Sequence, residues 1–338
     1  MKNKLGTILK LSFFLGLGFF FIWLFVRNLT SAQINEILIS FKRANYWWLF
    51  LSMLIGVTSH AVRAARWKML MEPLGYTPRF INVFFAVFIG YLANLALPRL
   101  GEVSRCGVLT RYEKIPFNKS FGTVIAERAL DMVVFLVIFF VTILMQFAEL
   151  KDYLYARIIE PLFGKVYLSG GPSYITWGII LLMLGFFVML YLLRKRFYHI
   201  NIVMKIRDML VGFLDGMKSL IHLRRPVTFA FYTILIWVCY YLMSYLVFFS
   251  LSETSHLSPL AGLAVLVFGS VGIMVVQGGI GVYQAIVAET LVLYGVTSTI
   301  GYAMGWLMWS AQNLMILVVG LVSLALLPLF NRNRINNG

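Results

Sequence analysis

The sequence predicts an all-α, polytopic membrane protein, and three observations support this fold class. Of the 338 residues, 61% are hydrophobic and only 12% are charged, and the mean hydropathy is +0.86, whereas a soluble domain of this size needs far more polar surface. The apolar residues form long continuous runs, not the short alternating segments of a β-barrel. The basic residues behind the net charge of +16 lie between these runs, which indicates the positive-inside rule and anionic lipids rather than nucleic acid.

The N-terminal part of the chain predicts two spans with a surface helix between them. The uncharged run 11–26 is long for a signal peptide, so we expect a retained first helix that begins on the cytoplasmic side. Apolar residues between positions 34 and 41 then recur at helical spacing, which predicts an amphipathic interfacial helix. The second span, 46–62, ends in a basic segment containing Arg63 and Arg66, which marks the cytoplasmic side.

The next uncharged run, 80–98, is followed by a strongly basic segment. If this run crossed the membrane fully, that basic segment would be extracytoplasmic, against the positive-inside rule. A re-entrant helical hairpin over about residues 80–119 removes the conflict, and Asn94, Pro98 and Gly101 provide points where the helix can break.

The remaining apolar runs complete the expected topology. We expect full spans at 132–148, 173–193, 227–250 and 300–327, and a cytoplasmic amphipathic helix at about 200–222. A second re-entrant region, about 259–295, is interrupted by the glycine-rich run that follows Gln277. The expectation is six full spans and two re-entrant hairpins with both termini cytoplasmic, in a single domain over 1–338; eight or nine plain spans are the alternative.

Charged residues gather at the first hairpin and in the segment after it. A charge at bilayer depth costs roughly 2.5–3.5 kcal/mol, so such residues usually face a polar cavity and pair with one another. Arg99, Glu102 and Arg105 have helical spacing at a predicted helix end, whose cations and N–H groups would suit a lipid phosphate. The candidate headgroup-binding residues are Arg63, Arg66, Asn94, Arg99, Glu102, Arg105, Glu127, Arg128 and Asp131.

If these charges share one cavity, five arginines face three carboxylates and two positive charges remain for an anionic headgroup. The alternative is an internal network in which Glu127 and Asp131 neutralise Arg99 and Arg105.

Two interrupted apolar segments that enter from opposite sides are typical of a transporter whose site lies at the membrane midplane. The alternative is that the glycines only let helices approach closely. The candidate gating residues are Pro98, Gly101, Gln277, Gly278, Gly279, Gly281, Gln284 and Gln312. The four histidines are scattered and no phosphate-binding loop or metal-ligand spacing appears, so we expect no catalytic residue, metal or cofactor.

Four pieces of the sequence carry a family resemblance: Arg63-Ala-Ala-Arg66-Trp67, the Pro98-Arg99-Leu-Gly101-Glu102 motif, Glu127-Arg128-Ala-Leu-Asp131, and Gly278-Gly279-Ile280-Gly281. On these residues the chain resembles the lysylphosphatidylglycerol synthase transmembrane (flippase-like) family of prokaryotic membrane proteins. The resemblance implies movement of a lipid between leaflets of the cytoplasmic membrane, here by a stand-alone module without the fused aminoacyl-transferase domain. Many relatives have a proline and an acidic residue where this chain has Gln277 and Gln284.

The sequence therefore favours a flippase for an anionic or zwitterionic phospholipid, or for a polyprenyl-phosphate-linked lipid, with membrane lipids as its partners. Arg99, Arg105 and Arg128 would hold the phosphate, and the carboxylates would position the arginines and carry protons. Two alternatives stay open: a membrane-embedded lipid-modifying transferase, and a non-transporting partner of a separate lipid-modifying enzyme.

Overall fold

The structure is a computed structural model that describes residues 20, 22–23, 25–27, 29–97, 100–146 and 223–332. Within these residues every regular element is a helix. Four helices are long and apolar enough to cross a membrane: α3 (Tyr46–Met71), α6 (Phe117–Met145), α11 (Pro226–Val247) and α14 (Ser298–Phe330). The predicted class, an all-α polytopic membrane protein, is confirmed. The spans expected at 11–26 and 173–193 and the amphipathic helix expected at 200–222 lie wholly or largely outside the described residues.

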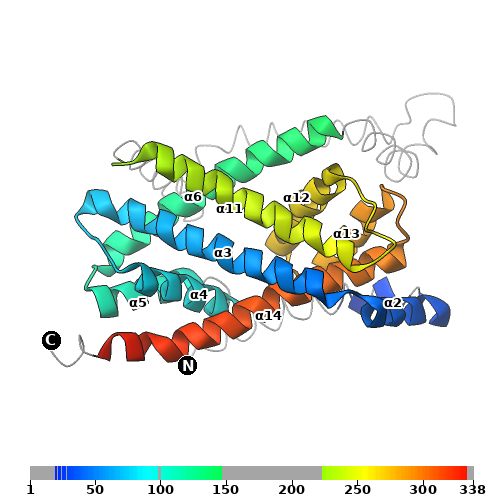
Figure 1. Cartoon of the computed structure of the whole chain (residues 1–338), viewed down its shortest axis with the longest axis horizontal. Helices are drawn as coiled ribbons and strands as arrows, with labels where there is room; N and C mark the ends of the chain where they lie inside the picture. The colour runs from blue at the N-terminus through cyan, green and yellow to red at the C-terminus, as the bar shows by residue number, and fades with distance from the viewer. Residues whose placement is uncertain are drawn as a thin grey trace, which may run out of the picture.

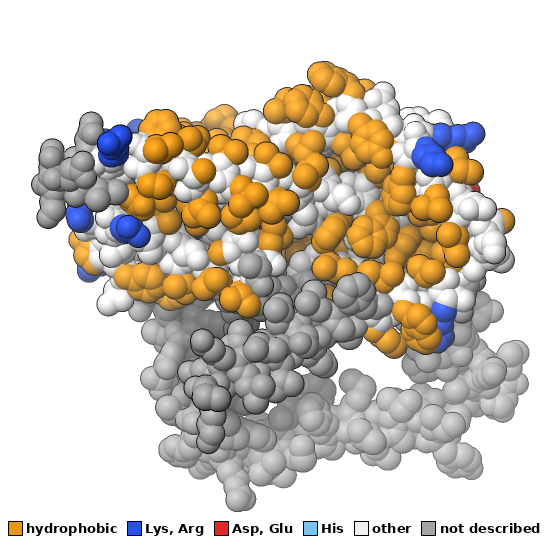
Figure 2. All heavy atoms as spheres, turned by 90° about the horizontal axis from the view of Figure 1, so that it is seen from below, with side chains coloured by type: hydrophobic (Ala, Val, Ile, Leu, Met, Phe, Trp, Pro, Cys, Tyr) orange, Lys and Arg blue, Asp and Glu red, His pale blue; other side chains and the backbone are white. Residues whose placement is uncertain are grey.

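Apolar side chains cover the middle of the face that carries α14, and lysines and arginines lie at its two ends (Figure 2). Leu314, Leu317, Val318 and Leu321 are among the exposed residues of this helix. A continuous apolar band bounded by charge is the surface that a lipid bilayer requires. We therefore expect the long axis of the molecule to cross the membrane.

The predicted surface helix is present as α2 (Ser31–Arg43). It begins with a capping box, in which Thr30 Oγ1 accepts from the Gln33 N–H at 3.3 Å and Gln33 Oε1 accepts from the Thr30 N–H at 2.9 Å. Ile37 is buried against Tyr302 and Ala303 of α14. Leu38, on the neighbouring position, is exposed, so the helix has one face on the bundle and another free to meet lipid.

Two pairs of short helices lie at opposite ends of the long axis (Figure 1). The first pair is α4 (Phe80–Ala96) and α5 (Leu100–Glu113), and the second is α12 (Pro259–Val275) and α13 (Val282–Val292), joined through the short 3-10 turn η4 (Gln277–Gly279). Each pair folds back at the break that the sequence predicts. The pairs are helical hairpins, and that they are re-entrant in a bilayer stays a prediction.

Helix α14 joins the two hairpins by packing on both of them. A Cβ on Gly301 or Gly305 would lie 2.8 Å from the backbone of α13, and one on Gly320 would lie 2.9 Å from Leu92 of α4. Trp309, one third of the way along α14, donates its indole N–H to the carbonyl oxygen of Gly278 at 2.6 Å. The tips of both hairpins therefore approach the middle of α14, from opposite ends.

Two helices are longer than the expected spans. Helix α3 continues past residue 62 to Met71, and α6 begins at Phe117 rather than near 132. The charged residues Arg63, Glu127 and Asp131 thus lie inside continuous helices. They do not end these helices because they pair with each other across the helix interface.

Candidate functional site

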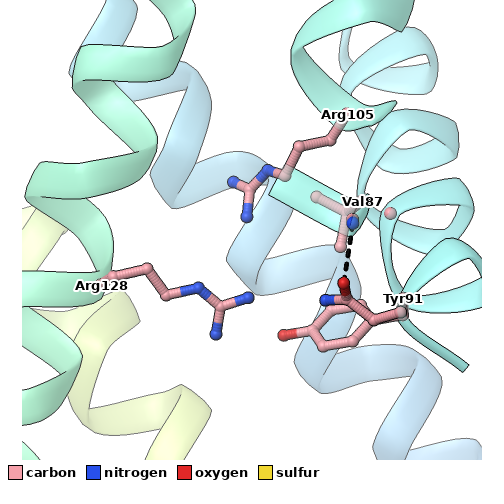
Figure 3. Close-up of a pocket in the computed structure, with 7 residues that line it drawn as sticks. Val87, Tyr91, Arg105 and Arg128 are labelled. Carbon is pink, nitrogen blue, oxygen red and sulfur yellow. Dashed lines mark hydrogen bonds between the residues drawn. The ribbon is translucent and has the colours of Figure 1, made fainter. Parts of the chain in front are cut away.

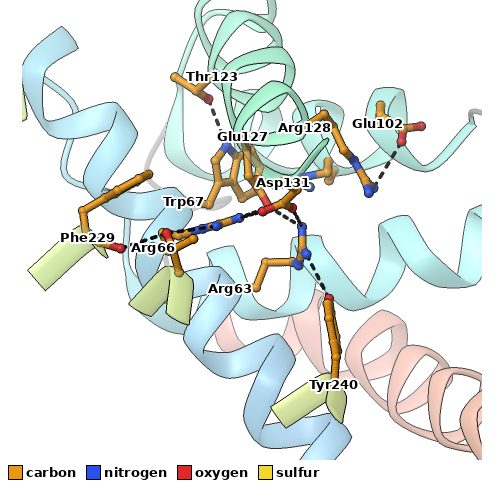
Figure 4. Close-up of polar contacts among 12 residues, drawn as sticks. Arg63, Arg66, Trp67, Glu102, Thr123, Glu127, Arg128, Asp131, Phe229 and Tyr240 are labelled. Carbon is orange, nitrogen blue, oxygen red and sulfur yellow. Dashed lines mark hydrogen bonds and ion pairs between the residues drawn. The ribbon is translucent and has the colours of Figure 1, made fainter. Parts of the chain in front are cut away.

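The main feature of the site is a group of arginines held by two carboxylates where α3, α5, α6 and α11 meet (Figure 4). Arg63 of α3 donates through Nη1 to Glu127 Oε1 at 2.6 Å and to Asp131 Oδ2 at 2.8 Å. Its Nη2 donates to the Tyr240 hydroxyl of α11 at 2.9 Å. Arg63 therefore has a fixed position between α6 and α11.

Arg66 lies one turn further along α3 and is completely buried. Its Nη2 donates to Asp131 Oδ1 at 2.6 Å, and its Nη1 donates to Thr233 Oγ1 at 3.2 Å. The guanidinium also lies over the ring of Phe229, 5.7 Å from the ring centre. Asp131 thus bonds both arginines of α3, one through each carboxylate oxygen.

Arg105 of α5 approaches the same carboxylates from the first hairpin. Its Nη2 donates to Glu127 Oε2 at 2.5 Å, and its guanidinium stacks 3.8 Å from the ring centre of Trp67. The Trp67 indole N–H is held in turn by Thr123 Oγ1 at 2.9 Å. A cation that is desolvated on one side by an aromatic ring and paired on the other is strongly localised.

We call these five charged residues the inner cluster: Arg63, Arg66, Arg105, Glu127 and Asp131. The cluster contains three cations and two carboxylates, so it carries one net positive charge. The side chains are at most 13% exposed. An excess positive charge in a buried, low-dielectric position attracts an anion more strongly than the same charge in water.

Arg128 and Glu102 form a second, more exposed ion pair, which we call the outer pair. Arg128 Nη2 lies 3.3 Å from Glu102 Oε1, and the two side chains are 42% and 26% exposed. Since the pair is neutral, the seven charged side chains together keep the one positive charge of the inner cluster.

A narrow cleft opens between the first hairpin and α6 (Figure 3). Its empty space is about 160 Å³, but no part is wide enough for a water-sized sphere. The guanidinium groups of Arg105 and Arg128 point into it from opposite sides, and Tyr91 of α4 lies beside them. The lining residues are Val87, Gly90, Tyr91, Asn94, Gly101, Arg105 and Arg128.

Small residues at the hairpin break bring the backbone of α4 and α5 together along this cleft. A Cβ on Gly101 would collide with the carbonyl oxygen of Gly90, so the close approach needs glycine at this position. Asn94 Oδ1 accepts from the Gly101 N–H at 2.7 Å and caps the first turn of α5. These contacts fix the position from which Glu102 and Arg105 project.

The second hairpin has a different geometry. Gly278, Gly279 and Gly281 have φ values of 69°, 71° and 79°, which favour glycine because other residues are strained there. The buried Gln284 accepts from the Gly281 N–H through Oε1 at 2.7 Å, and its Nε2 has no partner among the described residues. No residue of this hairpin lines the cleft.

The structure brings together most of the predicted headgroup-binding residues. Arg63, Arg66, Arg105, Glu127 and Asp131 form the inner cluster, Arg128 and Glu102 the outer pair, and Asn94 and Gly101 line the cleft. Pro98 and Arg99 lie outside the described residues. Without Arg99, four arginines face three carboxylates, so the described site has one excess positive charge and not the two expected from the sequence. The glycines of the second hairpin and Gln284 belong to another part of the bundle; the Gln277 side chain is not described, and Gln312 is half-buried in α14.

Three residues of α11 that contact the arginines were not predicted from the sequence. Phe229, Thr233 and Tyr240 recur at i, i+4 and i+11 and so share one face of α11. Two of them are polar, but α11 contains several other polar side chains, so polarity alone does not identify the face that meets the arginines.

The fold and the site define a multi-pass membrane protein with a buried, net-positive ion cluster beside a helical hairpin. The chain belongs to the family described as the lysylphosphatidylglycerol synthase TM region, whose model matches residues 8–328. It is similar to the UPF0104 membrane protein MJ1595 of Methanocaldococcus jannaschii, with 32% identity over 139 residues. The matched segment covers 40% of this chain and 40% of that protein. It is also similar to the UPF0104 membrane protein PH1989 of Pyrococcus horikoshii, with 25% identity over 288 residues, 78% of this chain and 82% of that protein. No solved structure matches the chain.

Proposed function

We propose that the protein binds the phosphate of a lipid headgroup in the cleft between the first hairpin and α6 and moves that lipid between the leaflets of a prokaryotic cytoplasmic membrane. The lipid is an anionic or zwitterionic phospholipid or a polyprenyl-phosphate-linked lipid. The observation that carries the proposal is that Arg105 and Arg128 point into one cleft from opposite sides.

Two guanidinium groups that face each other across a cleft repel each other unless an anion lies between them. Arginine donors match phosphate oxygens in a bidentate geometry, and charge-assisted hydrogen bonds of this kind are stronger than neutral ones. The inner cluster supports this role because it holds Arg105 in place and leaves one positive charge uncompensated. A phosphodiester, with one negative charge, matches that excess.

The cleft in this state is too narrow for a headgroup, so the proposed transport needs the cleft to widen at the outer pair of Glu102 and Arg128, while the Arg105–Glu127 ion pair holds the hairpin on α6. Within the hairpin, α4 and α5 are held together by the Gly90–Gly101 contact and the Asn94 cap, and the hairpin is joined to α6 by the Arg105–Glu127 ion pair. Two hairpins that approach the middle of α14 from opposite ends resemble the arrangement by which secondary transporters alternate access around a central site. With the N-terminus cytoplasmic, the first hairpin would open to the inside and the second to the outside.

A flipping assay tests the proposal. Purified protein is placed in vesicles that contain phosphatidylglycerol labelled with a fluorophore on one acyl chain, close to the headgroup, and dithionite then reduces the label on the outer leaflet only. We expect the wild-type protein to expose label from the inner leaflet and Arg128→Gln to slow this exposure. Since a hydrogen bond to a charged group contributes about 1.5–3 kcal/mol, the expected loss is about tenfold or more.

Arg111→Gln is the matched control, because Arg111 is an exposed arginine at the far end of α5. We expect this variant to flip lipid at the wild-type rate. If vesicles with the wild-type protein lose no more fluorescence than vesicles without protein, across phosphatidylglycerol, phosphatidylethanolamine and polyprenyl-phosphate probes, the proposed transport is wrong.

The same protein, purified in detergent where no leaflets exist, distinguishes a transferase from a flippase. A transferase converts a donor lipid there and releases product, whereas a flippase binds lipid without changing it chemically.

The partner alternative predicts that Arg128→Gln leaves lipid distribution unchanged while an enzyme that co-purifies with the wild type is lost.

A further inference from the structure

We propose that Glu102 acts as an internal substitute for the lipid phosphate: its carboxylate holds Arg128 in the closed cleft, and an arriving headgroup displaces it. This inference rests on the proposed function, because it assigns the closing element of that same site. It separates the arginines into a structural set and a ligand-exchanging one, which the sequence pattern alone treats as equivalent.

The first observation is the difference between the ion pairs. The closest contacts of the inner cluster are 2.5–2.8 Å and involve side chains that are 0–13% exposed. The outer pair has one contact of 3.3 Å between side chains that are 42% and 26% exposed. A long, single, partly hydrated ion pair contributes little stability, so a bidentate phosphate can replace it at small cost.

The second observation is the other oxygen of Glu102. Oε2 is buried and has no hydrogen-bond partner among the described residues. Both oxygens of Glu127, by contrast, accept hydrogen bonds from arginines. A buried acceptor without a partner costs about 1–3 kcal/mol, so the closed position of the Glu102 carboxylate is unfavourable. Displacement of the carboxylate into water relieves that cost.

The third observation is where the two residues lie. Glu102 is in the first turn of α5, next to Gly101 at the hairpin break, and Arg128 is on α6. The cleft lies between these two elements and is lined by Gly101 and Arg105 on one side and by Arg128 on the other. The outer pair therefore links the two sides of the cleft (Figure 4). When a phosphate takes the place of Glu102, that link is broken and the outer part of the cleft can widen, while the Arg105–Glu127 ion pair keeps the hairpin attached to α6.

The test is a binding titration of the fluorescent phosphatidylglycerol to purified protein in an uncharged detergent. Glu102→Gln removes the competing charge and keeps the side-chain shape. Exposed ion pairs contribute about 0.2–1 kcal/mol, so we expect Glu102→Gln to lower the Kd by about 1.5- to fivefold. In an Arg128→Gln background the same substitution should leave the Kd unchanged, because there is no cation left to release.

The control is Glu113→Gln, which removes a negative charge from the opposite end of α5, where Glu113 accepts from the Asn82 amide. We expect no change in Kd. Glu102→Ala is the second variant should Glu102→Gln fold poorly, and it should tighten binding in the same way.

Three other results are decisive. If Glu102→Gln leaves the Kd unchanged while Arg128→Gln raises it, the substitute role of Glu102 is wrong and the proposed function stands. If Glu102→Gln lowers the Kd equally with and without Arg128, the change comes only from the loss of a negative charge near the site, and the inference is overturned. If Arg105→Gln and Arg128→Gln both bind like the wild type, the proposed site itself is wrong.

Discussion

Arg105 Nη2 and Glu127 Oε2 lie 2.5 Å apart with both side chains buried, and this ion pair fixes the first hairpin to α6. Glu127 also accepts from Arg63 of α3. One carboxylate therefore connects α3, α5 and α6. The cluster exists because Glu127 is buried at the point where these helices meet.

The first prediction concerns Glu127. Glu127→Gln leaves Asp131 as the single carboxylate of the inner cluster against three buried arginines. Removal of one partner from a buried ion pair typically costs about 3–5 kcal/mol, and we expect a loss of this size in the free energy of unfolding. Reversible unfolding in mixed micelles measures it. Lys119→Gln, at an exposed position in the first turn of the same helix, should change the free energy by less than about 0.5 kcal/mol; equal effects for the two variants would show that the cluster does not hold the bundle together.

The second prediction concerns the hairpin break. Gly101→Ala places a Cβ against the Gly90 carbonyl oxygen and the Asn94 amide. Because one of these neighbours is backbone, the hairpin must open, at a cost of about 1–3 kcal/mol. Gly107→Ala, on the same helix, meets nothing within 4 Å and should be neutral or slightly stabilising. Thermal unfolding of the two variants checks this, and a Gly101→Ala protein as stable as Gly107→Ala would contradict the packing described.

The third prediction concerns the second hairpin. Gly278 has a φ of 69° and open space around it, so an added side chain meets strain in the backbone alone. We expect Gly278→Ala to cost about 1–2 kcal/mol and Gly278→Asn to cost less, because asparagine adopts this conformation more readily. Gly122→Ala is the control, as Gly122 is a helical residue with nothing within 4 Å. Should alanine and asparagine behave alike at 278, the left-handed turn is not what glycine provides there.

The fourth prediction concerns membrane topology. Single cysteines replace Thr77, Asn118 and Ser255, three exposed loop or helix-end positions, in a background where Cys106 and Cys239 are alanine. We expect an impermeant thiol reagent to label positions 77 and 118 from the cytoplasmic side and position 255 from the outer side. If 77 and 118 are labelled from opposite sides, the first hairpin is a plain span and the re-entrant interpretation is wrong.

The sequence predicted the fold class, both hairpins and most members of the charged cluster, for physical reasons that apply locally. Apolar runs identify spans because lipid excludes unpaired backbone and charge. Gly101 marks a break because its neighbours leave no room for a side chain. Gly278 marks another because a side chain would be strained at its positive φ. The acids Glu127 and Asp131 were assigned to the site because an isolated charge in the bilayer is costly.

The pairing of the charges could not be predicted. Which arginine meets Glu127 depends on how α3, α5 and α6 pack, and contacts between residues more than 60 positions apart leave no local pattern. The alternative internal network has Glu127 and Asp131 neutralising Arg99 and Arg105. In the structure Glu127 pairs with Arg105 and Asp131 pairs with Arg63 and Arg66, whereas Arg99 lies outside the described residues.

The most direct test of the central claim is an experimental map of the protein in lipid nanodiscs that contain phosphatidylglycerol. We predict density for a phosphate between the guanidinium groups of Arg105 and Arg128, with Glu102 turned away from Arg128. A map in which lipid headgroups lie only on the outer surface, and the outer pair stays closed at saturating lipid, would contradict the account.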